Sequence, residues 1–338
     1  MKSETPQNHE LIEEISTDKE HLLARKLREY LQKKTIRGFK GLSFYEVGRY
    51  FLRSIFMENI SLSASSLSFN FFLALFPALL FLLTLIAYLP FHGMKTQLIE
   101  QLSLILPERT YEEISQTILE ILRKQNSSLL SFGFLLTIYF ASNAFHILIN
   151  TFNRRLAGTD MRAKQNWFII RARAIFLTFL LTVLIIIFLA IVTVSVQIET
   201  YMIENDWPLV RLYSFLIVLI EYLLVAAVFV FTISSIYFFA PSKTERWTFF
   251  SIGALLAGAL SIIATFGFTL YVNNFDSYNK VYGSIGAIIA LMVLIYINTF
   301  SMIIGFELNT SIDKAEIARV RIKKKQISSQ QLPSDNIR

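Results

Sequence analysis

Several polar side chains lie inside long apolar stretches of this chain, where an unpaired polar group is costly. Four of them share one stretch and three lie in two others: Asn143, His146, Asn150 and Asn153, then Glu221, Asn298 and Glu307. Spacings of three, four and three residues keep the first four on one helical face. Such side chains are suited to binding a proton, a cation or a polar solute within a membrane. We therefore expect them to line a polar pathway open to the cytoplasm, with Glu221 as the proton or cation site.

Hydrogen bonding between helices is the competing interpretation of the same residues. Asn side chains that pair across neighbouring helices stabilise a membrane bundle by ~0.6–2 kcal/mol each. Under this interpretation His146 is a neutral, hydrogen-bonded side chain. Glu307 then pairs with a basic residue or caps a helix near the inner surface. The sequence leaves both interpretations open.

Groups for hydrolytic or redox chemistry are few. The chain has no Cys, so it has no disulfide, thiolate metal site or cysteine nucleophile. A metal-dependent nuclease needs clustered His, Asp or Glu, whereas the histidines are dispersed at His9, His21, His92 and His146. A Gly-rich phosphate loop of the P-loop type is also absent from the sequence. We predict no enzymatic activity, no catalytic residue, no cofactor and no bound metal.

The stretches that carry the polar residues are long enough to cross a membrane as helices. The apolar runs cover residues 67–89, 129–152, 175–198, 212–239, 249–272 and 285–308. An α-helix needs ~20 residues to cross a ~30 Å hydrocarbon core. The sequence therefore predicts an all-α, polytopic membrane protein built as a six-transmembrane-helix bundle. Pro77 should kink the first helix because proline cannot donate a backbone hydrogen bond.

The distribution of Lys and Arg predicts the orientation. The N-terminal region, the loop between the second and third runs and the C-terminal tail are rich in both residues. The third and fifth loops hold only Arg211 and Lys280. By the positive-inside rule both termini are cytoplasmic, so topology explains the net charge of +7 without specific nucleic-acid binding. We expect the partners to be the lipid bilayer and anionic lipids at the cytoplasmic face; the oligomeric state stays open.

The chain divides into three predicted regions. They are a cytoplasmic helical or flexible region over 1–42, a membrane domain over 43–312 and a basic cytoplasmic tail over 313–338. An N-terminal interfacial helix is expected within 43–60, followed by an elbow at the Ser-rich stretch Ser61–Ser68. The first external loop, 90–128, has apolar residues at helical spacing, which predicts two short amphipathic helices.

Aromatic, glycine and amide residues follow one another in a distinctive order near the end of the chain. They are Tyr271, Val272, Phe275, Ser277, Tyr278, Asn279, Tyr282, Gly283, Ser284, Gly286 and Ala287, then Gly305, Glu307, Leu308 and Asn309. Upstream are Leu75-Phe76-Pro77, Phe152-Asn153-Arg154, Arg171, Arg173, Pro241 and Gly253-Ala254. In this order they resemble the YihY/virulence factor BrkB family, whose members were once labelled ribonuclease BN. The resemblance covers roughly residues 43–312.

The resemblance implies an integral inner-membrane protein with six helices, of a family for which transport or export has been proposed. The chain departs from the family pattern at Asn70-Phe71, at Ala74 and at Leu294, where a Trp is usual. Our hypothesis is a secondary transporter or exporter of an unidentified solute or lipid. The alternatives are a non-transporting envelope scaffold and a lipid-handling membrane protein.

Overall fold

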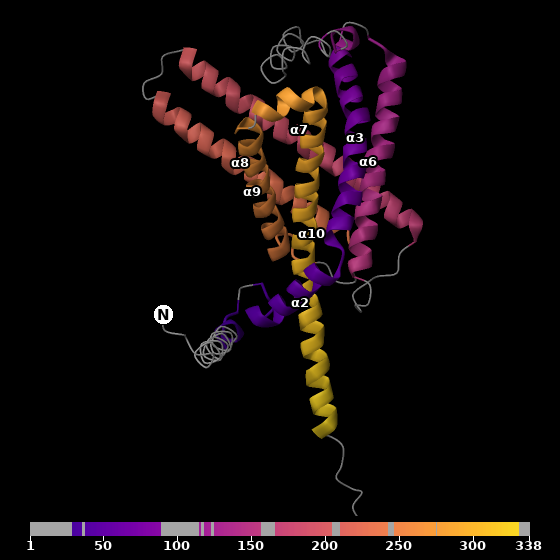
Figure 1. Ribbon diagram of the computed structural model, residues 1–338, viewed down its shortest axis with the longest axis vertical. Helices are drawn as coiled ribbons and strands as arrows, with labels where there is room; N and C mark the ends of the chain where they lie inside the picture. Colours follow the sequence, from indigo (N-terminus) through magenta and orange to yellow (C-terminus); the bar gives the residue numbers. More distant parts are fainter. Residues whose placement is uncertain are drawn as a thin grey trace, which may run out of the picture. The chain divides into compact units, whose positions relative to one another are not determined.

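The protein is mostly α-helical in the part of the chain that the structure describes (Figure 1). This computed structural model describes residues 29–35, 38–88, 115, 118–122, 125–156, 166–204, 210–242, 247–274 and 276–330. Its helices are α2 (Phe44–Met57), α3 (Ile60–Tyr88), α6 (Ser127–Arg155), α7 (Trp167–Glu204), α8 (Val210–Phe239), α9 (Ile252–Asn274) and α10 (Asp276–Gln330). Among these residues, six helices are long and apolar enough to cross a membrane. The prediction of an all-α, polytopic membrane protein with six spans is confirmed.

The chain forms two compact units. One unit consists of residues 59–306, and the other joins residues 1–58 to residues 307–338. Helix α10 contributes residues to both, while α2 belongs to the second unit.

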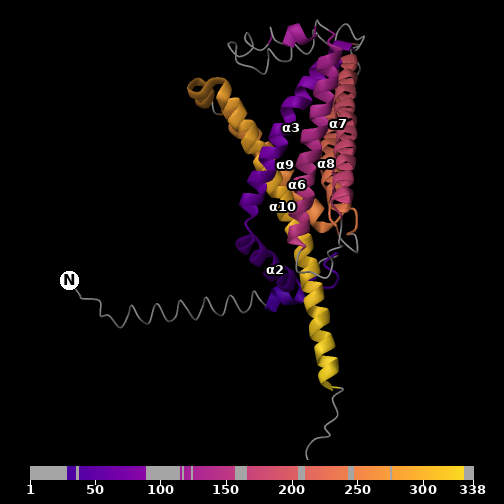
Figure 2. The same ribbon diagram turned by 90° about the vertical axis from the view of Figure 1, so that its right-hand side faces the viewer.

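Within residues 59–306, helices that follow one another in the sequence pack side by side. Helix α3 packs on α6, α6 on α7, α7 on α8 and α8 on α9, as Figures 1 and 2 show for α3 and α6. Helix α10 joins this bundle through polar contacts: the Tyr237 hydroxyl of α8 donates to the Met302 carbonyl, and Asn298 donates to Thr265 of α9 at 3.2 Å. We call residues 59–306 the membrane unit. It is held together by contacts between helices that follow one another in the sequence and by the hydrogen bonds of α10 to α8 and α9.

A cluster of aromatic rings fixes one end of this bundle. The ring of Phe152 stacks on that of Phe306, with centroids 3.8 Å apart and planes 8° from parallel. Tyr237 packs edge-on against both rings, and Trp247 packs against Phe306. Phe152 and Phe306 are fully buried. Because aromatic pairs contribute about 0.5–1.5 kcal/mol beyond their buried area, this cluster ties α6, α8 and α10 together.

Glycine allows α9 and α10 to approach closely. A Cβ atom at Gly305 would collide with the Gly253 carbonyl oxygen and lie 2.6 Å from the Ala257 Cβ atom. Small residues at such crossings let helix backbones pack in a membrane, where no hydrophobic effect drives helices together. Gly305, Gly253 and Ala257 thus form a close crossing of α9 and α10.

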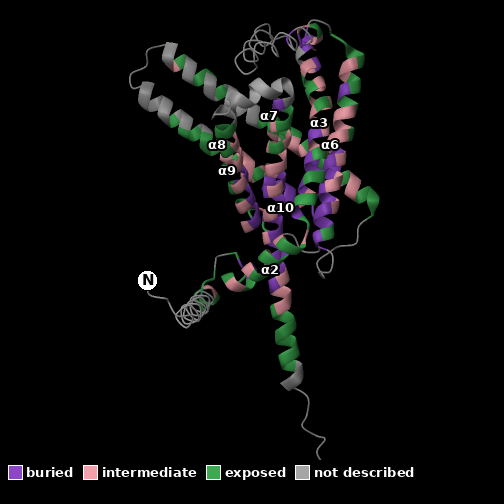
Figure 3. Cartoon of the chain, in the orientation of Figure 1, coloured by how far each residue is buried: buried purple, intermediate pink, exposed green. Residues whose placement is uncertain are grey.

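Large apolar side chains on the outside of the helices suit contact with lipid. Phe168 is 77% exposed, Phe179 70% and Ile263 67%. Figure 3 shows exposed positions on each of α3, α6, α7 and α8. Soluble proteins rarely expose so large an apolar surface, whereas hydrocarbon accepts it without cost.

Three helix boundaries differ from the sequence prediction. The Ser-rich stretch Ser61–Ser68 is not an elbow but lies inside α3, and the helical break falls at Glu58–Asn59. Serine tolerates the helix because its hydroxyl can donate to a carbonyl one turn earlier. Ser63 donates to Asn59 at 3.2 Å and Ser65 donates to Ser61 at 3.0 Å.

Helices also extend into segments that were assigned to loops. Helix α7 begins at Trp167 and so contains Arg171 and Arg173. Helix α10 begins at Asp276, so it contains residues after Phe275 that were assigned to the fifth loop, and it runs unbroken to Gln330. Of the two helices expected over 90–128, residues 118–122 are helical and most of the rest lies outside the described residues.

Candidate functional site

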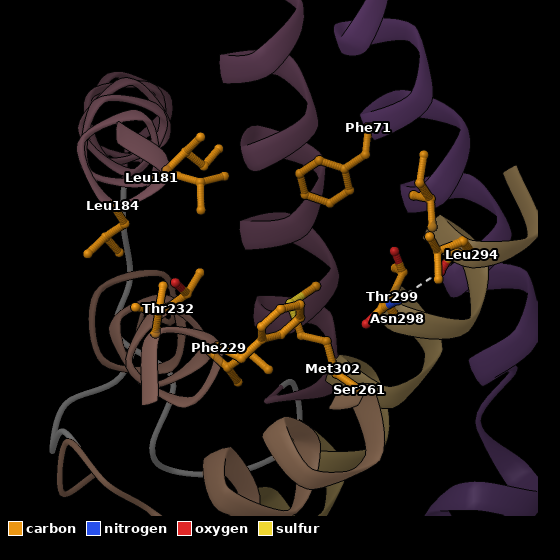
Figure 4. A pocket seen from close by; sticks show the side chains of 14 residues that line it. Phe71, Leu181, Leu184, Phe229, Thr232, Ser261, Leu294, Asn298, Thr299 and Met302 are labelled. Carbon is orange, nitrogen blue, oxygen red and sulfur yellow. Dashed lines mark hydrogen bonds between the residues drawn. The ribbon is translucent and has the colours of Figure 1, made fainter. Parts of the chain in front are cut away.

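A cavity of about 430 Å³ lies within the membrane unit, among α3, α7, α8, α9 and α10 (Figure 4). Ten of its lining residues are apolar, among them Phe71, Leu181 and Leu294. The other four carry one small polar group each: Thr232, Ser261, Asn298 and Thr299. A volume of this size falls within the range of small-molecule sites, which are mostly apolar with a few polar groups that orient the ligand.

The polar groups of the cavity gather mainly where α9 meets α10. The Asn298 side-chain amide donates to the Leu294 carbonyl at 3.0 Å and to the Thr265 hydroxyl at 3.2 Å. Ser261 lies one helical turn before Thr265 and is buried. Asn298 therefore has its two amide hydrogens bonded, and its side-chain carbonyl oxygen lies 3.5 Å from the Thr265 hydroxyl. Three of the four polar lining residues therefore lie on α9 and α10, and Thr232 on α8 is the fourth.

Asn143 of the predicted stripe bonds to α3 and is not among the residues that line the cavity. Its side-chain amide donates to the Asn70 side-chain oxygen at 3.3 Å. Asn70 in turn donates to the Ser66 carbonyl at 2.8 Å. The residue at which the chain departs from the family pattern thus forms a hydrogen bond between helices.

Asn153 forms a reciprocal pair with Ser242, which follows α8. The Asn153 amide donates to the Ser242 hydroxyl at 3.0 Å, and the Ser242 backbone N–H donates to the Asn153 side-chain oxygen at 2.8 Å. Both residues are buried. This pair has the geometry of a structural contact.

His146 and Asn150 are half-buried on the same helix. The His146 ring centroid lies 6.5 Å from that of Trp167. The buried Nδ1 atom of His146 has no hydrogen-bond partner within the described part of the chain. His146 thus differs from Asn143 and Asn153, whose side chains bond across to other segments.

The two predicted carboxylates are placed differently. Glu221 belongs to α8, and its side chain lies outside the described residues. Glu307 is fully buried, and its carboxylate accepts a hydrogen bond from the Thr310 hydroxyl at 3.1 Å. Glu307 is not among the described residues that line the cavity. Within the described ranges there is no group of three or more His, Asp or Glu that could hold a metal ion.

The remaining residues of the family resemblance lie on three helices. Pro77 is inside α3, where the predicted kink stays a prediction, and Tyr271 is exposed on α9. Gly286, Gly305 and Asn309 are buried in α10. Helix α10 also holds Tyr278, Asn279, Tyr282 and Gly283, whose side chains lie outside the described residues.

Of the predicted pathway residues whose side chains the structure describes, Asn298 is the one that lines the cavity. Sequence reasoning did not single out Thr232, Ser261 or Thr299 as pathway residues. A useful signal was available for Thr299, because it follows Asn298 directly in an otherwise apolar helix. No comparable signal marks Thr232, since helical periodicity does not specify which neighbour a face meets.

Similarity to known proteins covers most of the chain. The family described as Virulence factor BrkB matches residues 51–329. "Putative ribonuclease-like protein YfkH" of Bacillus subtilis (strain 168) is 31% identical over 275 residues, which is 78% of this chain and 94% of that protein. A UPF0761 membrane protein of Aliivibrio fischeri (strain MJ11) is 35% identical over 81 residues, which is 24% of this chain and 26% of that protein. No solved structure matches the chain.

Proposed function

The chain belongs to the Virulence factor BrkB family, and from this premise we propose that it is a secondary transporter or exporter of an amphipathic solute or lipid. The family match covers residues 51–329, so it begins within α2 and includes all six candidate spans. Membership makes the chain an integral, multi-pass membrane protein. The transported substrate is the part that we propose.

The composition of the cavity is the observation that carries this proposal. A path for a small ion needs oxygen ligands or water along its length, because a bare charge in an apolar surrounding costs several kcal/mol. Ten of the fourteen residues that line this cavity are apolar. Such a lining favours an acyl or other hydrocarbon segment over a hydrated ion.

The polar face of the cavity supplies the complementary half of an amphipathic site. Asn298, Thr299 and Ser261 offer an amide and two hydroxyls and no formal charge. These groups are suited to an ester, hydroxyl or amide of the substrate, next to the apolar segment. Directionality and energy would come from Glu221, which we retain as the proposed proton or cation site on α8. We also propose that the membrane is the bacterial inner membrane and that both termini are cytoplasmic.

Filling the cavity tests the proposal. Ile295→Trp adds bulk at a lining position, and Val293→Trp makes the same kind of change at a nearby, exposed position that does not line the cavity. The assay follows a fluorescent short-chain phospholipid crossing the bilayer of proteoliposomes. We expect Ile295→Trp to slow the movement about tenfold, because ~1.4 kcal/mol of lost binding corresponds to that factor. Val293→Trp should match the wild-type protein.

Other outcomes separate the alternatives. A wild-type rate equal to that of protein-free vesicles would reject transport of this lipid class. If the wild-type protein still binds the fluorescent lipid, and Ile295→Trp weakens that binding, a lipid-handling protein that does not transport is the better description. A scaffold is favoured if neither binding nor movement depends on the cavity.

We propose that this chain has no nuclease activity. The ribonuclease-like name belongs to the relative from Bacillus subtilis. Incubation of the purified protein with RNA and Mg²⁺ or Zn²⁺ is expected to leave the RNA intact. Cleavage that copurifies with the protein and is lost on chelation would contradict this expectation.

A further inference from the structure

The unit formed by residues 1–58 and 307–338 contains a second groove, of about 570 Å³. Helix α2 and the C-terminal part of α10 form its walls. Its charged residues are Glu46 and Arg49 on α2 and Arg319 and Lys323 on α10. Tyr45 and Tyr50 add two phenol groups, and the α10 side includes Ala315, Ala318, Ile322 and Gln326.

Helical spacing explains why the basic groups converge. Arg319 and Lys323 are four residues apart and therefore lie on one face of α10. Arg49 follows Tyr45 by four residues and so shares a face of α2 with it. The groove thus collects three cationic side chains from two helices.

Three described carboxylates of this unit, those of Glu46, Asp313 and Glu316, are engaged by other groups. Glu46 accepts from the Ser43 backbone N–H at 2.8 Å and from the Ser43 hydroxyl at 2.9 Å, in the capping box that starts α2. Asp313 and Glu316 on α10 both bind the Lys40 ammonium, at 3.2 Å and 2.5 Å. With three cations and one carboxylate, the lining of the groove carries a net charge of +2.

The groove is held in shape by contacts on either side of it. Lys314 of α10 binds the Glu58 carboxylate at 3.1 Å and the Ser54 hydroxyl at 3.3 Å, and both partners lie at the end of α2. Arg319 donates to the Gly41 carbonyl at 3.0 Å, just before α2 begins. A site whose walls are already positioned loses less entropy when a ligand binds.

We propose that this groove binds a phosphate group, carried either by a soluble phosphorylated molecule or by an anionic lipid headgroup. Guanidinium groups match phosphate oxygens with two parallel hydrogen bonds, and an ammonium adds a point charge. The phenol groups of Tyr45 and Tyr50 add hydrogen-bonding groups next to the cations. The volume exceeds that of an inorganic ion, so the phosphate is expected to be attached to a larger molecule. This site is separate from the cavity of the proposed transport function and does not depend on it.

The experiment uses the full chain and two double variants of equal charge. Arg49→Gln with Lys323→Gln removes two cations from the groove. Lys324→Gln with Lys325→Gln removes two exposed cations from the same helix outside the groove. Arg319 is retained because it also bonds the Gly41 carbonyl. Equal thermal unfolding temperatures in detergent establish that both variants are folded.

Two arms identify the source of the phosphate. In the first, calorimetry measures binding of glycerol 3-phosphate to protein in nanodiscs of neutral phosphatidylcholine. In the second, native mass spectrometry counts the phosphatidylglycerol that the protein retains from mixed nanodiscs. We expect the groove variant to lose about tenfold in affinity or retention in one of the arms, because charge-assisted bonds to phosphate are strong. The control variant should change by no more than about twofold, since Lys324 and Lys325 do not line the groove and attract the phosphate only as screened charges.

Each result decides the question. Binding of glycerol 3-phosphate that the groove variant loses identifies a soluble ligand, and loss confined to phosphatidylglycerol identifies a headgroup. Equal losses in the two double variants would mean that general charge attraction, not the groove, holds the phosphate. No binding by the wild-type protein in either arm would also overturn the proposal.

Discussion

Asn153 and Ser242 bind each other through two reciprocal hydrogen bonds, although 89 residues separate them in the sequence. The bonds join the C-terminal end of α6 to the segment that follows α8. Next to Asn153 in the chain, Phe152 stacks on Phe306 of α10. Two consecutive residues of α6 therefore contact two different parts of the membrane unit, one by hydrogen bonds and one by an aromatic stack.

Asn153→Ala should lower the free energy of unfolding by about 2 kcal/mol, because it removes both bonds to Ser242 from a buried site. Unfolding in mixed detergent and SDS, followed by circular dichroism, measures the change. Asn143→Ala is the matched control, since its bond to Asn70 is longer and only part-buried. We expect a loss of about 0.6 kcal/mol there. Equal losses at the two positions would contradict the special role of the Asn153 pair.

Gly305→Ala should destabilise the protein by about 1–3 kcal/mol, because the added methyl group would force α9 and α10 apart. The Gly253 carbonyl oxygen and the Ala257 Cβ atom occupy the space that it needs. Gly267→Ala provides the control, since a Cβ atom at Gly267 meets nothing within 4 Å. The same unfolding assay is expected to show no loss for Gly267→Ala. A Gly305→Ala protein as stable as wild type would show that the helix crossing can relax.

Glu221→Gln should abolish any dependence of flux on a pH gradient, because an amide cannot take up or release a proton. Flux of the fluorescent phospholipid is measured in proteoliposomes with and without an imposed gradient. Tyr222→Phe changes an adjacent, exposed position and is expected to leave the gradient response intact. A Glu221→Gln protein that responds like wild type would remove Glu221 from the mechanism.

Lys40 should make stability depend on pH in the alkaline range. Burial lowers the pKa of the Lys40 ammonium, but Glu316 and Asp313 outweigh this effect, so the pKa is raised above 10.5. A raised pKa in the folded state stabilises the protein below pH ~10.5, and this contribution is lost as the pH rises through the folded pKa. Because Lys40 is partly exposed, we expect less than about 1 kcal/mol.

Lys40→Met tests this dependence by removing the ammonium. The difference in stability between wild type and Lys40→Met should be constant at neutral pH and shrink above pH ~10.5. Lys324→Met, at an exposed lysine of α10, controls for the titration of other lysines and tyrosines. A difference that stays constant up to pH 12 would show that Lys40 does not titrate in a folded state with these partners.

The sequence was sufficient for the fold class, the six spans and the family, because length and apolar composition determine them. Helical spacing also placed Asn143 and Asn153 correctly on the same helix. Spacing along one helix does not reveal hydrogen-bond partners on other segments, however. Asn143 bonds to Asn70, and Asn153 bonds to Ser242. Asn298 lines a cavity and bonds to Thr265. Which residues share a site depends on how distant helices pack, and this information is not contained in a single helix.

The predicted helix boundaries at these two places were wrong for a different reason. Serine and tyrosine are frequent in turns and at membrane interfaces, so Ser61–Ser68 and the residues around Tyr278 were assigned to connections. In the structure both belong to long helices. Serine hydroxyls can bond to their own helix, as Ser65 does to Ser61, and composition alone does not show this.

The position of Trp247 gives the aromatic cluster an optical signature. Its ring lies 5.1 Å from that of Phe306 and 6.4 Å from that of Tyr237. An indole held in a fixed, asymmetric surrounding of other rings gives a near-ultraviolet circular dichroism band that a freely rotating indole lacks. The chain therefore carries a built-in chromophore at the junction of α8 and α10, whose spectrum follows the packing there without any attached dye.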